Sequence, residues 1–535
     1  MISISRSLAI LALAITWSIA WTAYGVDGTA ISGTVKNSAG APYRGAFVKV
    51  RNVKTTMTFN VLSDSAGRYR VQNVPPGDYE IRATAIGYKD DVRSGVTVAA
   101  NVSRSFDFTL EKGKVRWSDL NTYQGRQLLP KTRDHDLSYN DRFFTSCFQS
   151  CHSFQKTMTS TAWDENGWRG RVKYMRDVIM AGEGGGTMTD QVVEDFTSYL
   201  TFAFGPKSPK PQSPEDLPEY QRLVRSFSDD ATKIEYVEFD FAGSKGLGPW
   251  SAVEDKDGMI WSPYYGRGNE VTRLNPNTGE LIRFPLSFKK TAGIHSAIPA
   301  PDGTIWFTEA ALSKIGHLNP STEEISEYEN LYPDGKPAGS HTIRVDENGK
   351  VWISGGTTIS SFDPKTKEFK HYGVAGTYGN VVGKDGDQWF TVFREGNSPI
   401  ARVSKDGKVS EFYPPTKGKP QRLEVDSDGI VWFSERRGGK IGRFDPKTET
   451  FKEFQLPGPE PSPYALGIDR NHMIWYASHE QDTIGRLNPN TGEVTEYPFP
   501  HSEISMREFF LDSQGRMWYG SPANDKIGYF IPPER

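Results

Sequence analysis

The chain has 535 residues, too many for one ordinary hydrophobic core, so several domains are expected. Glycine (52 residues) and proline (34) are abundant and aromatic residues reach 12%, a composition typical of a turn-rich β protein. The formal net charge is −3 with both signs interspersed, which argues against an electrostatic nucleic-acid binder.

Residues 1–25 have the pattern of a secretory signal peptide. An early arginine precedes an apolar run over residues 8–19, and Ala23 and Gly25 are the small residues of a cleavage site. An uncleaved anchor is the alternative, since the two tryptophans of this stretch suit a membrane interface. No other apolar run approaches the roughly 20 residues that span a bilayer. We therefore expect a periplasmic or secreted protein without integral membrane contact after cleavage.

Residues 29–112 are predicted to form a small β-sandwich, because short alternating strands are separated by turn signals at 64–67 and 75–77. The stretch resembles the carboxypeptidase regulatory-like family, a transthyretin-like sandwich. The resemblance rests on GTV at 33–35, GAFV at 45–48, DSAGRY at 64–69, VPPGDY at 74–79 and GY at 87–88. It implies a stability, adhesion or binding module without catalytic residues of its own.

Residues 136–205 change character and are predicted to form a small all-α domain. Apolar residues recur at helical spacing over 168–176 and 191–200, with Thr189-Asp190 as a cap for the second helix. Residues 206–231 follow as a proline-rich stretch, which predicts a semi-rigid extended linker.

Cys147 and Cys151 are the only cysteines, and with His152 they form Cys-x-x-x-Cys-His. Covalent c-type haem attachment usually uses Cys-x-x-Cys-His, so this motif carries one extra residue. Two alternatives remain: a disulfide, which would close almost no loop, and a Cys/Cys/His metal site, which lacks a fourth ligand.

The order of the motif and the helices that follow it resembles small cytochrome c domains found beside periplasmic propellers. The resemblance implies one covalent haem c held by Cys147 and Cys151, with His152 as the proximal iron ligand. Met188 is the candidate for the second axial ligand, and Met175 and Met180 are further options.

Residues 232–535 contain a sevenfold repeat in which a tryptophan follows a polar turn. The tryptophans stand at 261, 306, 352, 389, 432, 475 and 518, with spacings of 45, 46, 37, 43, 43 and 43 residues. Four-stranded propeller blades have about this period, so a seven-bladed β-propeller is predicted. The seventh repeat lacks its last strand, and residues 234–241 have the pattern of that strand, so they are predicted to close the ring.

Two of the turns, at 255–258 and 426–429, look like the start of a calcium loop. Both lack the acidic residue at the twelfth position, which favours ordinary hairpin turns.

The repeat region resembles the virginiamycin B lyase (streptogramin lyase) family of seven-bladed propellers. The resemblance rests on IWFTE at 305–309, KIG at 314–316, VWFSE at 431–435, KIGRFD at 440–445 and TIGRLN at 483–488. It implies a carbon–oxygen lyase that uses two histidines on adjacent blades and carboxylates that hold a divalent metal.

The residue eleven positions before each repeat tryptophan defines a column at the start of each innermost strand. Its members are Trp250, His295, His341, Tyr378, Gln421, Tyr464 and Arg507. They are predicted to form a ring at the channel mouth that either faces a ligand or fills the mouth.

His295 and His341 match the catalytic histidine pair of the family. Gly339 and Gly355 stand where carboxylates near His341 would be needed, so the implied metal site is incomplete. Glu309 and Glu435 occupy the carboxylate column of other blades, where a structural role toward backbone N–H groups is the alternative.

The sequence thus predicts a mainly β protein with an N-terminal sandwich, a cytochrome c-like helical domain and a C-terminal propeller. The leading hypothesis is an exported c-type haem protein, possessing a ligand-binding propeller, that acts in electron transfer or as an oxidoreductase. Its expected partner is a small-molecule substrate or a periplasmic redox protein. The alternatives are a lyase acting through His295 and His341, and a non-catalytic carbohydrate- or peptide-binding protein.

Overall fold

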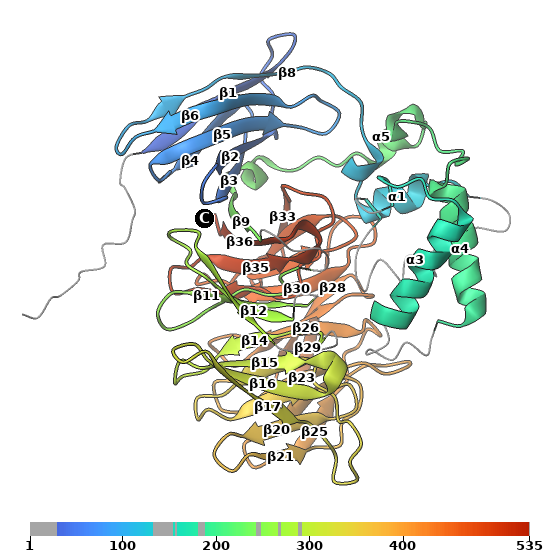
Figure 1. The fold of residues 1–535 in the computed structure, drawn as a ribbon, viewed down its shortest axis with the longest axis vertical. Helices are drawn as coiled ribbons and strands as arrows, with labels where there is room; N and C mark the ends of the chain where they lie inside the picture. Colours follow the sequence, from blue (N-terminus) through green and yellow to red (C-terminus); the bar gives the residue numbers. More distant parts are fainter. Residues whose placement is uncertain are drawn as a thin grey trace, which may run out of the picture.

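The computed structural model describes residues 29–131, 154–155, 158–179, 188–241, 248–265, 269–286 and 292–533. The described chain is mainly β, as predicted, and its sheets form a sandwich and a propeller with a helical segment beside them (Figure 1). The expected signal peptide and the cysteine motif lie outside the described residues. Among the described helices, none has the length and apolarity that a membrane span requires.

Six blades of the propeller are consecutive four-stranded antiparallel sheets. In each blade the repeat tryptophan lies on the second strand, where it is buried between neighbouring sheets. The first blade contains β10(Val253–Glu254), β11(Ile260–Tyr264), β12(Glu270–Leu274) and β13(Leu281–Pro285). The second contains β14(Ala297–Pro299), β15(Ile305–Glu309), β16(Lys314–Asn319) and β17(Glu324–Glu329). The third contains β18(Thr342–Val345), β19(Val351–Ser354), β20(Ile359–Asp363) and β21(Glu368–His371).

The next three blades have the same order. They are β22(Thr377–Val382), β23(Gln388–Val392), β24(Ile400–Val403) and β25(Val409–Phe412); β26(Pro420–Val425), β27(Val431–Glu435), β28(Lys440–Asp445) and β29(Thr450–Gln455); and β30(Pro463–Ile468), β31(Ile474–Ser478), β32(Thr483–Leu487) and β33(Val494–Pro498).

One hydrogen bond recurs in five blades and ties the first turn of each blade to its tryptophan. The indole Nε1 of the tryptophan donates to the carboxylate six residues earlier: Trp261 to Asp255 (2.6 Å), Trp352 to Asp346 (3.0 Å), Trp432 to Asp426 (2.8 Å), Trp475 to Asp469 (2.8 Å) and Trp518 to Asp512 (2.7 Å). The other carboxylate oxygen accepts backbone N–H groups of the turn, as in Asp426, which accepts from residues 428 and 430. These bonds explain the turns at 255–258 and 426–429 as hairpin turns.

The seventh blade is closed by a strand from the N-terminal side of the propeller. It comprises β34(Phe510–Leu511), β35(Met517–Ser521), β36(Lys526–Ile531) and β9(Glu235–Asp240). Strands β36 and β9 pair antiparallel over six residues, from Lys526 opposite Asp240 to Ile531 opposite Glu235. The predicted ring closure by residues 234–241 is therefore confirmed, and it covers two sheet edges at once.

The second edge of β9 pairs with the sandwich, through β3(Thr58–Leu62). This pairing joins the seventh blade and one sandwich sheet into a single sheet of eight strands. The residues at 58–62 had no predicted strand, although they form the contact between the two domains. The junction also buries the Glu238 carboxylate, which accepts hydrogen bonds from Asn60 (3.1 Å) and Tyr519 (3.3 Å) and contacts His501 (2.6 Å).

The sandwich has the strands that the turn signals predict, apart from β3. Its remaining strands are β1(Ala30–Asn37), β2(Phe47–Asn52), β4(Arg68–Gln72), β5(Gly77–Thr84), β6(Asp91–Val98), β7(Arg104–Ser105) and β8(Phe108–Leu110). Alternate side chains of β2, β4 and β5 are buried, which is the pattern of strands with one face on a core.

The helical segment contains α1(Thr122–Leu128), α3(Glu165–Tyr174), a π-helical turn η3(Met175–Ile179) and α4(Asp190–Phe204). Thr189 caps α4 by accepting a hydrogen bond from the Val192 N–H, as its sequence predicts. The hydrophobic cluster of this segment starts at Val115, before the predicted boundary at residue 136. A cytochrome c fold is not established by these helices.

The stretch predicted as an extended linker also carries helical turns, namely η5(Pro214–Asp216), α5(Tyr220–Leu223) and η6(Asp229–Lys233). Tyr220 is 7% exposed and packs into the helical cluster, with Leu217 and Leu223 against it. The prediction of an extended linker did not foresee that the few apolar residues between the prolines give the stretch a packed face.

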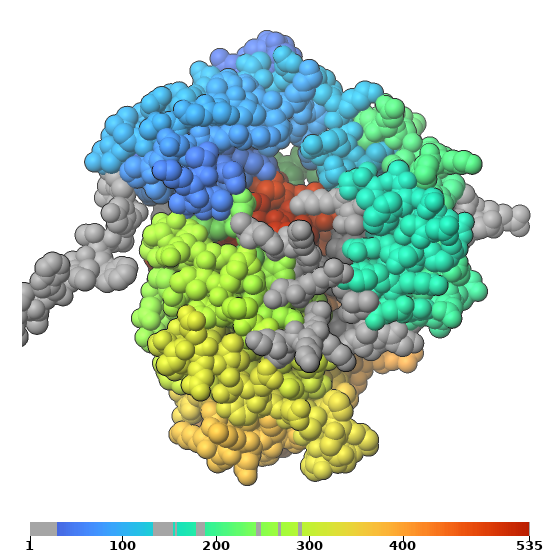
Figure 2. All heavy atoms as spheres, in the orientation of Figure 1, coloured from blue at the N-terminus to red at the C-terminus, as the bar shows by residue number. Residues whose placement is uncertain are grey.

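The helical segment contacts the loop that follows β31 in the sixth blade. The Tyr123 N–H donates to the Glu480 carbonyl (2.9 Å), and Gln155 Nε2 donates to the Asp482 carboxylate (3.0 Å). Arg126 forms an ion pair with Glu460 of the same blade. Figure 2 shows the sandwich in blue and the helical segment in teal, seated against the propeller.

The closing strand provides a test of the ring. Phe239 is 3% exposed and stacks on Trp518 at 6.1 Å between ring centroids, whereas Ile531 on the partner strand is 42% exposed. We expect Phe239→Ala to destabilise the propeller by about 3–5 kcal/mol, and Ile531→Ala to change its stability by less than about 0.5 kcal/mol. Denaturant unfolding followed by tryptophan fluorescence measures both. Equal midpoints for the two variants would contradict closure by β9.

Candidate functional site

Six of the seven predicted column residues contact one another around the channel mouth. His295 and His341 lie 3.7 Å apart between ring centroids, and His341 and Tyr378 lie 4.3 Å apart. The Tyr378 and Tyr464 hydroxyls hydrogen-bond across the fifth blade. The Arg507 guanidinium lies over the rings of Tyr464 (4.7 Å) and Trp250 (4.8 Å), and Trp250 contacts His295 (5.6 Å).

The column thus forms a ring because each member precedes the innermost strand of its blade, and these strands converge on the channel. Gln421, the seventh member, is 4% exposed, and its backbone carbonyl accepts a bond from Thr391. His341 and Tyr378 are half-buried, whereas the other members are buried. The structure brings the sequence-predicted His295 and His341 together, on adjacent blades and at van der Waals contact.

Both histidines are held in the neutral form. Burial lowers the pKa of His341 to about 3, and the Arg422 guanidinium contributes to the lowering. Burial also lowers the pKa of His295 well below its usual range, with His341 and Arg422 acting in the same direction. His341 Nδ1 lies 3.0 Å from Thr342 Oγ1 and 3.3 Å from the Tyr378 carbonyl oxygen. In the tautomer that donates from Nδ1 to this carbonyl, Nε2 keeps a lone pair that can take a proton.

Tyr464 is the most cation-rich position of the ring. Three guanidinium groups lie near its ring: Arg507 at 4.7 Å, Arg436 at 5.0 Å and Arg422 at 5.8 Å. Burial alone would raise the pKa of Tyr464, but these guanidiniums offset the burial and lower it. The pKa of Tyr378 is raised, by burial first and then by Tyr464. The hydroxyl of Tyr464 is thus the more acidic partner of the pair.

Arg422 crosses the channel directly beneath this ring. Its Nε donates to the Arg507 carbonyl (3.1 Å) and one terminal nitrogen donates to Thr342 Oγ1 (2.9 Å). The same nitrogen lies 3.4 Å from the Glu508 carboxylate, which also pairs with Arg344 at 2.9 Å. Arg422 therefore connects the third, fifth and seventh blades and forms the floor of the mouth.

A second column, four residues after each tryptophan, carries functional side chains that sequence reasoning missed. Tyr265 stacks on Trp250 (4.3 Å), Phe393 on Tyr378 (4.6 Å) and His479 on Tyr464 (4.6 Å), and Arg436 lies over Tyr464. Each member follows the second strand of its blade, so it returns to the same end of the sheet as the first column. Counting four residues forward from each tryptophan is the sequence signal that would have found them.

The divalent metal implied by the family resemblance does not fit this mouth. A Cβ atom added at Gly339 would lie 1.8 Å from the Gly355 carbonyl oxygen, and one at Gly355 would lie 2.5 Å from the Ala338 carbonyl oxygen. Neither position can take a carboxylate without a shift of the backbone. Within the described ranges, no group of three or more His, Cys, Asp or Glu side chains could hold a metal ion. The arginines instead occupy this end of the channel.

Glu309 and Glu435 were expected either to serve as metal ligands or to bond backbone N–H groups. Both side chains are fully buried and neither carboxyl has a hydrogen-bond partner among the described residues, so the structural interpretation is wrong as stated. Burial raises the pKa of each to about 8, with Glu327 acting on Glu309 and Glu453 on Glu435 in the same direction. Both groups are therefore predominantly neutral carboxylic acids at pH 7.

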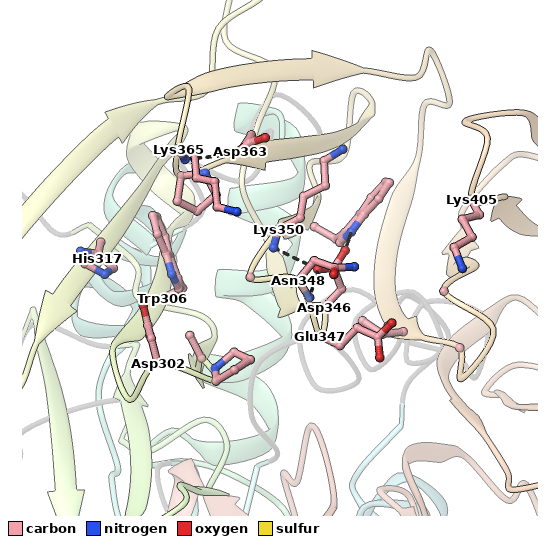
Figure 3. Close-up of a pocket in the computed structure, with 18 of the residues that line it drawn as sticks. Asp302, Trp306, His317, Asp346, Glu347, Asn348, Lys350, Asp363, Lys365 and Lys405 are labelled. Atoms are coloured by element: carbon pink, nitrogen blue, oxygen red, sulfur yellow. Dashed lines mark hydrogen bonds between the residues drawn. The ribbon is translucent and has the colours of Figure 1, made fainter.

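A cavity of about 900 Å³ lies at the opposite ends of the inner strands, between the second, third and fourth blades (Figure 3). Trp306 and His317 line one side, the turn at 346–350 lies in the middle and Lys405 lies on the other side. The aspartate that bonds the tryptophan elsewhere is replaced by Ala300 and Gly383 in the two flanking blades, and both residues line the cavity. Asp346, in the middle of the cavity, is bonded to the Trp352 indole.

The predicted haem residues Cys147, Cys151 and His152 lie outside the described residues. Met188 lies within them, is 7% exposed and belongs to the helical hydrophobic cluster with Phe154 and Trp168. The role of Met188 as an axial ligand stays a prediction.

The sheets form a seven-bladed propeller with a histidine pair at the channel mouth. The sequence profile of the virginiamycin B lyase family matches residues 364–532, and that of the carboxypeptidase regulatory-like domain matches residues 30–111. Both resemblances drawn from the sequence motifs are supported. The cytochrome c resemblance rests on the sequence motif alone.

Individual relatives agree with these matches. Virginiamycin B lyase of Nocardia farcinica is 27% identical over 215 residues, which cover 39% of this chain and 70% of the relative. The crystal structure of virginiamycin B lyase from Staphylococcus aureus superimposes with a TM-score of 0.51 and 25% identity, over 56% of this chain and all of that enzyme. A catalytically inactive variant of the S. aureus enzyme with quinupristin has the same fold, with a TM-score of 0.51 and 23% identity over 56% of this chain and all of that chain.

The buried carboxyls predict a pH dependence of stability. Between about pH 4.5 and about pH 8, folded Glu309 and Glu435 keep protons that the unfolded chain has lost, so their contribution to stability falls as the pH rises. We expect the double variant Glu309→Gln/Glu435→Gln to gain stability relative to the parent by about 4 kcal/mol per site as the pH rises between these limits. Denaturant unfolding of the variant and the parent at both pH values measures the difference in their free energies of unfolding. The buried histidines contribute equally to both proteins, so their contribution cancels in this difference. A gain that does not depend on pH would show that both carboxyls are ionised or bonded in the folded protein.

Proposed function

We propose that the propeller is a carbon–oxygen lyase that acts on a small molecule containing an ester, with His341 as the general base. The observation that carries the proposal is the contact between neutral His295 and His341, with the Nε2 lone pair of His341 available at a half-buried surface. The similarity of the propeller to virginiamycin B lyases supports the same reaction class. Fold alone would not, because propellers carry many functions.

The reaction is an elimination. His341 Nε2 takes a proton from the carbon next to a carbonyl group, and the C–H electron pair becomes a carbon–carbon double bond. The bond from the neighbouring carbon to the ester oxygen breaks, and the leaving carboxylate takes that electron pair. The proton on His341 then passes to the carboxylate or to water, which restores the enzyme. Atoms and charge balance without an added oxidant, reductant or metal.

His295 and the arginines serve the same step. The His295 ring packs against His341 and fixes its plane, and the Tyr378 carbonyl oxygen accepts from Nδ1 in the tautomer that leaves Nε2 free. Negative charge develops on the carbonyl oxygen as the proton leaves, and the positive potential of Arg422 and Arg507 stabilises it. Guanidinium groups thus supply the charge stabilisation that a divalent metal would supply in a carboxylate-lined site.

Turnover of quinupristin and of simpler β-acyloxy esters tests the proposal, with mass spectrometry to detect the alkene product. We expect His341→Gln to lower kcat by about 10²–10⁴-fold. His472→Gln, at an exposed histidine of the sixth blade, should change it less than twofold. Treatment with EDTA should leave the rate unchanged. Equal activity of His341→Gln and the parent, or no turnover of any ester, would overturn the lyase assignment.

We also propose that the helical segment carries one covalent haem c, as a second and separate function. The supporting observation is the Cys147-x-x-x-Cys151-His152 motif ahead of helices that bury Met188 beside Phe154. The two cysteines would hold the porphyrin and His152 the iron, and the haem would supply one-electron transfer. The partner would then be a periplasmic redox protein.

Expression in a host with cytochrome c maturation tests this second function. We expect a Soret band in the exported protein and haem that stays with the polypeptide on a denaturing gel. Cys147→Ser/Cys151→Ser should remove the covalent haem, while Met188→Leu should retain it and shift the spectrum. A colourless parent protein exported in that host would overturn the haem proposal and leave the lyase proposal untouched.

A further inference from the structure

We propose that the channel mouth binds an oxyanion through Arg436 and Arg422, beside the Tyr464 ring. The substrate of the proposed lyase would then bear a carboxylate or phosphate group. This inference rests on the proposed function only in treating the bound anion as part of a substrate; anion binding itself does not depend on lyase activity. It is carried by buried guanidinium groups and by N–H donors that no protein group satisfies.

The guanidiniums converge on one place. Arg422, Arg436 and Arg507 all lie within 5.8 Å of the centre of the Tyr464 ring, although they come from the fifth and seventh blades. Their exposed fractions are 4%, 8% and 1%. Burial of three cationic side chains around one phenol ring is a placement that solvated surface arginines do not have.

Several donors at this place have no acceptor in the described part of the chain. One terminal nitrogen of Arg436 and the indole Nε1 of Trp250 make no hydrogen bond, and the second terminal nitrogen of Arg422 makes none of normal geometry, with the Tyr464 hydroxyl as its neighbour. Arg436 uses only its Nε, which donates to Ser462 Oγ at 3.4 Å. Buried N–H groups are almost always satisfied, so unsatisfied ones within a single mouth indicate an acceptor that binds there.

Among the described residues, the carboxylates nearest Arg422 and Arg436 do not balance these two guanidiniums. Glu508 pairs with both Arg344 and Arg422, so one negative charge serves two positive ones. Glu480 acts on Arg436 at longer range, and no ion pair joins the two. Burial raises the pKa of Glu424 to about 8, which leaves that side chain predominantly neutral at pH 7. An excess of buried positive charge is costly unless an anion enters.

A bound oxyanion would also complete the catalytic chemistry. The arginines that lower the pKa of His341 make its protonated form unfavourable, which weakens it as a base. An anion among them offsets their charge, so the pKa of His341 rises when the substrate binds. The site would then be more basic when an anion occupies it, so esters that carry an anionic group should be turned over faster than neutral esters.

Arg436 can be tested against a matched neighbour. Arg437 is exposed and adjacent in the chain, so Arg437→Gln removes the same charge without touching the mouth. The probes are succinate and inorganic phosphate, with succinamide as the neutral counterpart of succinate. Isothermal titration of the full-length protein measures binding, and the C2–H signals of His341 and His295 in NMR report the titration of the pair.

We expect at least one of the two anions to bind and succinamide not to bind. Arg436→Gln should weaken the binding at least tenfold, Arg437→Gln less than twofold, and the bound anion should raise the pKa of His341. The preferred anion distinguishes a carboxylate substrate from a phosphate. Because Arg436→Gln removes a buried side chain, Arg436→Lys and a circular dichroism spectrum control for folding.

Three results would overturn the inference: no binding of either anion to the parent below about 10 mM, equal loss in Arg436→Gln and Arg437→Gln, or succinamide binding as well as succinate. Anion binding that depends on Arg436 without turnover of any ester would overturn only the lyase proposal. Ester turnover that depends on His341 but is unchanged in Arg436→Gln would overturn only the proposal of an oxyanion site.

Discussion

The whole arrangement depends on one strand that is hydrogen-bonded along both edges. Strand β9 supplies the last strand of the seventh blade and also the neighbour of β3 in the sandwich. A propeller with an open blade would expose two sheet edges, and the column of inner residues would lose its fixed spacing. Closure of the ring by β9 therefore positions the channel mouth, although β9 itself contributes no residue to it.

The mouth shows how a repeat can keep its geometry while its chemistry changes. Column positions are set by the strand register, so the residue eleven before each tryptophan faces the channel whatever its type. In this chain the third blade has glycines where a metal-binding lyase would need carboxylates, and the fifth and seventh blades contribute arginines. Positive charge at this mouth is carried by guanidinium groups.

Much of the fold could be predicted because its signals are local and repeated. The tryptophan period predicted seven blades, and the missing last strand predicted closure by residues 234–241. The contact between His295 and His341 followed from the same count. Strand β3 was missed because pairing between two domains leaves no mark in either local pattern. Arg422 was missed because its side chain reaches across the channel, and sequence spacing specifies where a residue starts but not how far it reaches.

The chain leaves the sandwich after β8, forms the helical segment and returns as β9 to the sheet that contains β2, β3 and β5. The helical segment is thus an insertion between β8, which pairs with β1 in one sandwich sheet, and β9, which belongs to the other, and it is also docked on the sixth blade through Tyr123 and Gln155. Whatever group this segment carries therefore meets the propeller as an intramolecular neighbour. Its effective concentration there is independent of how dilute the protein is.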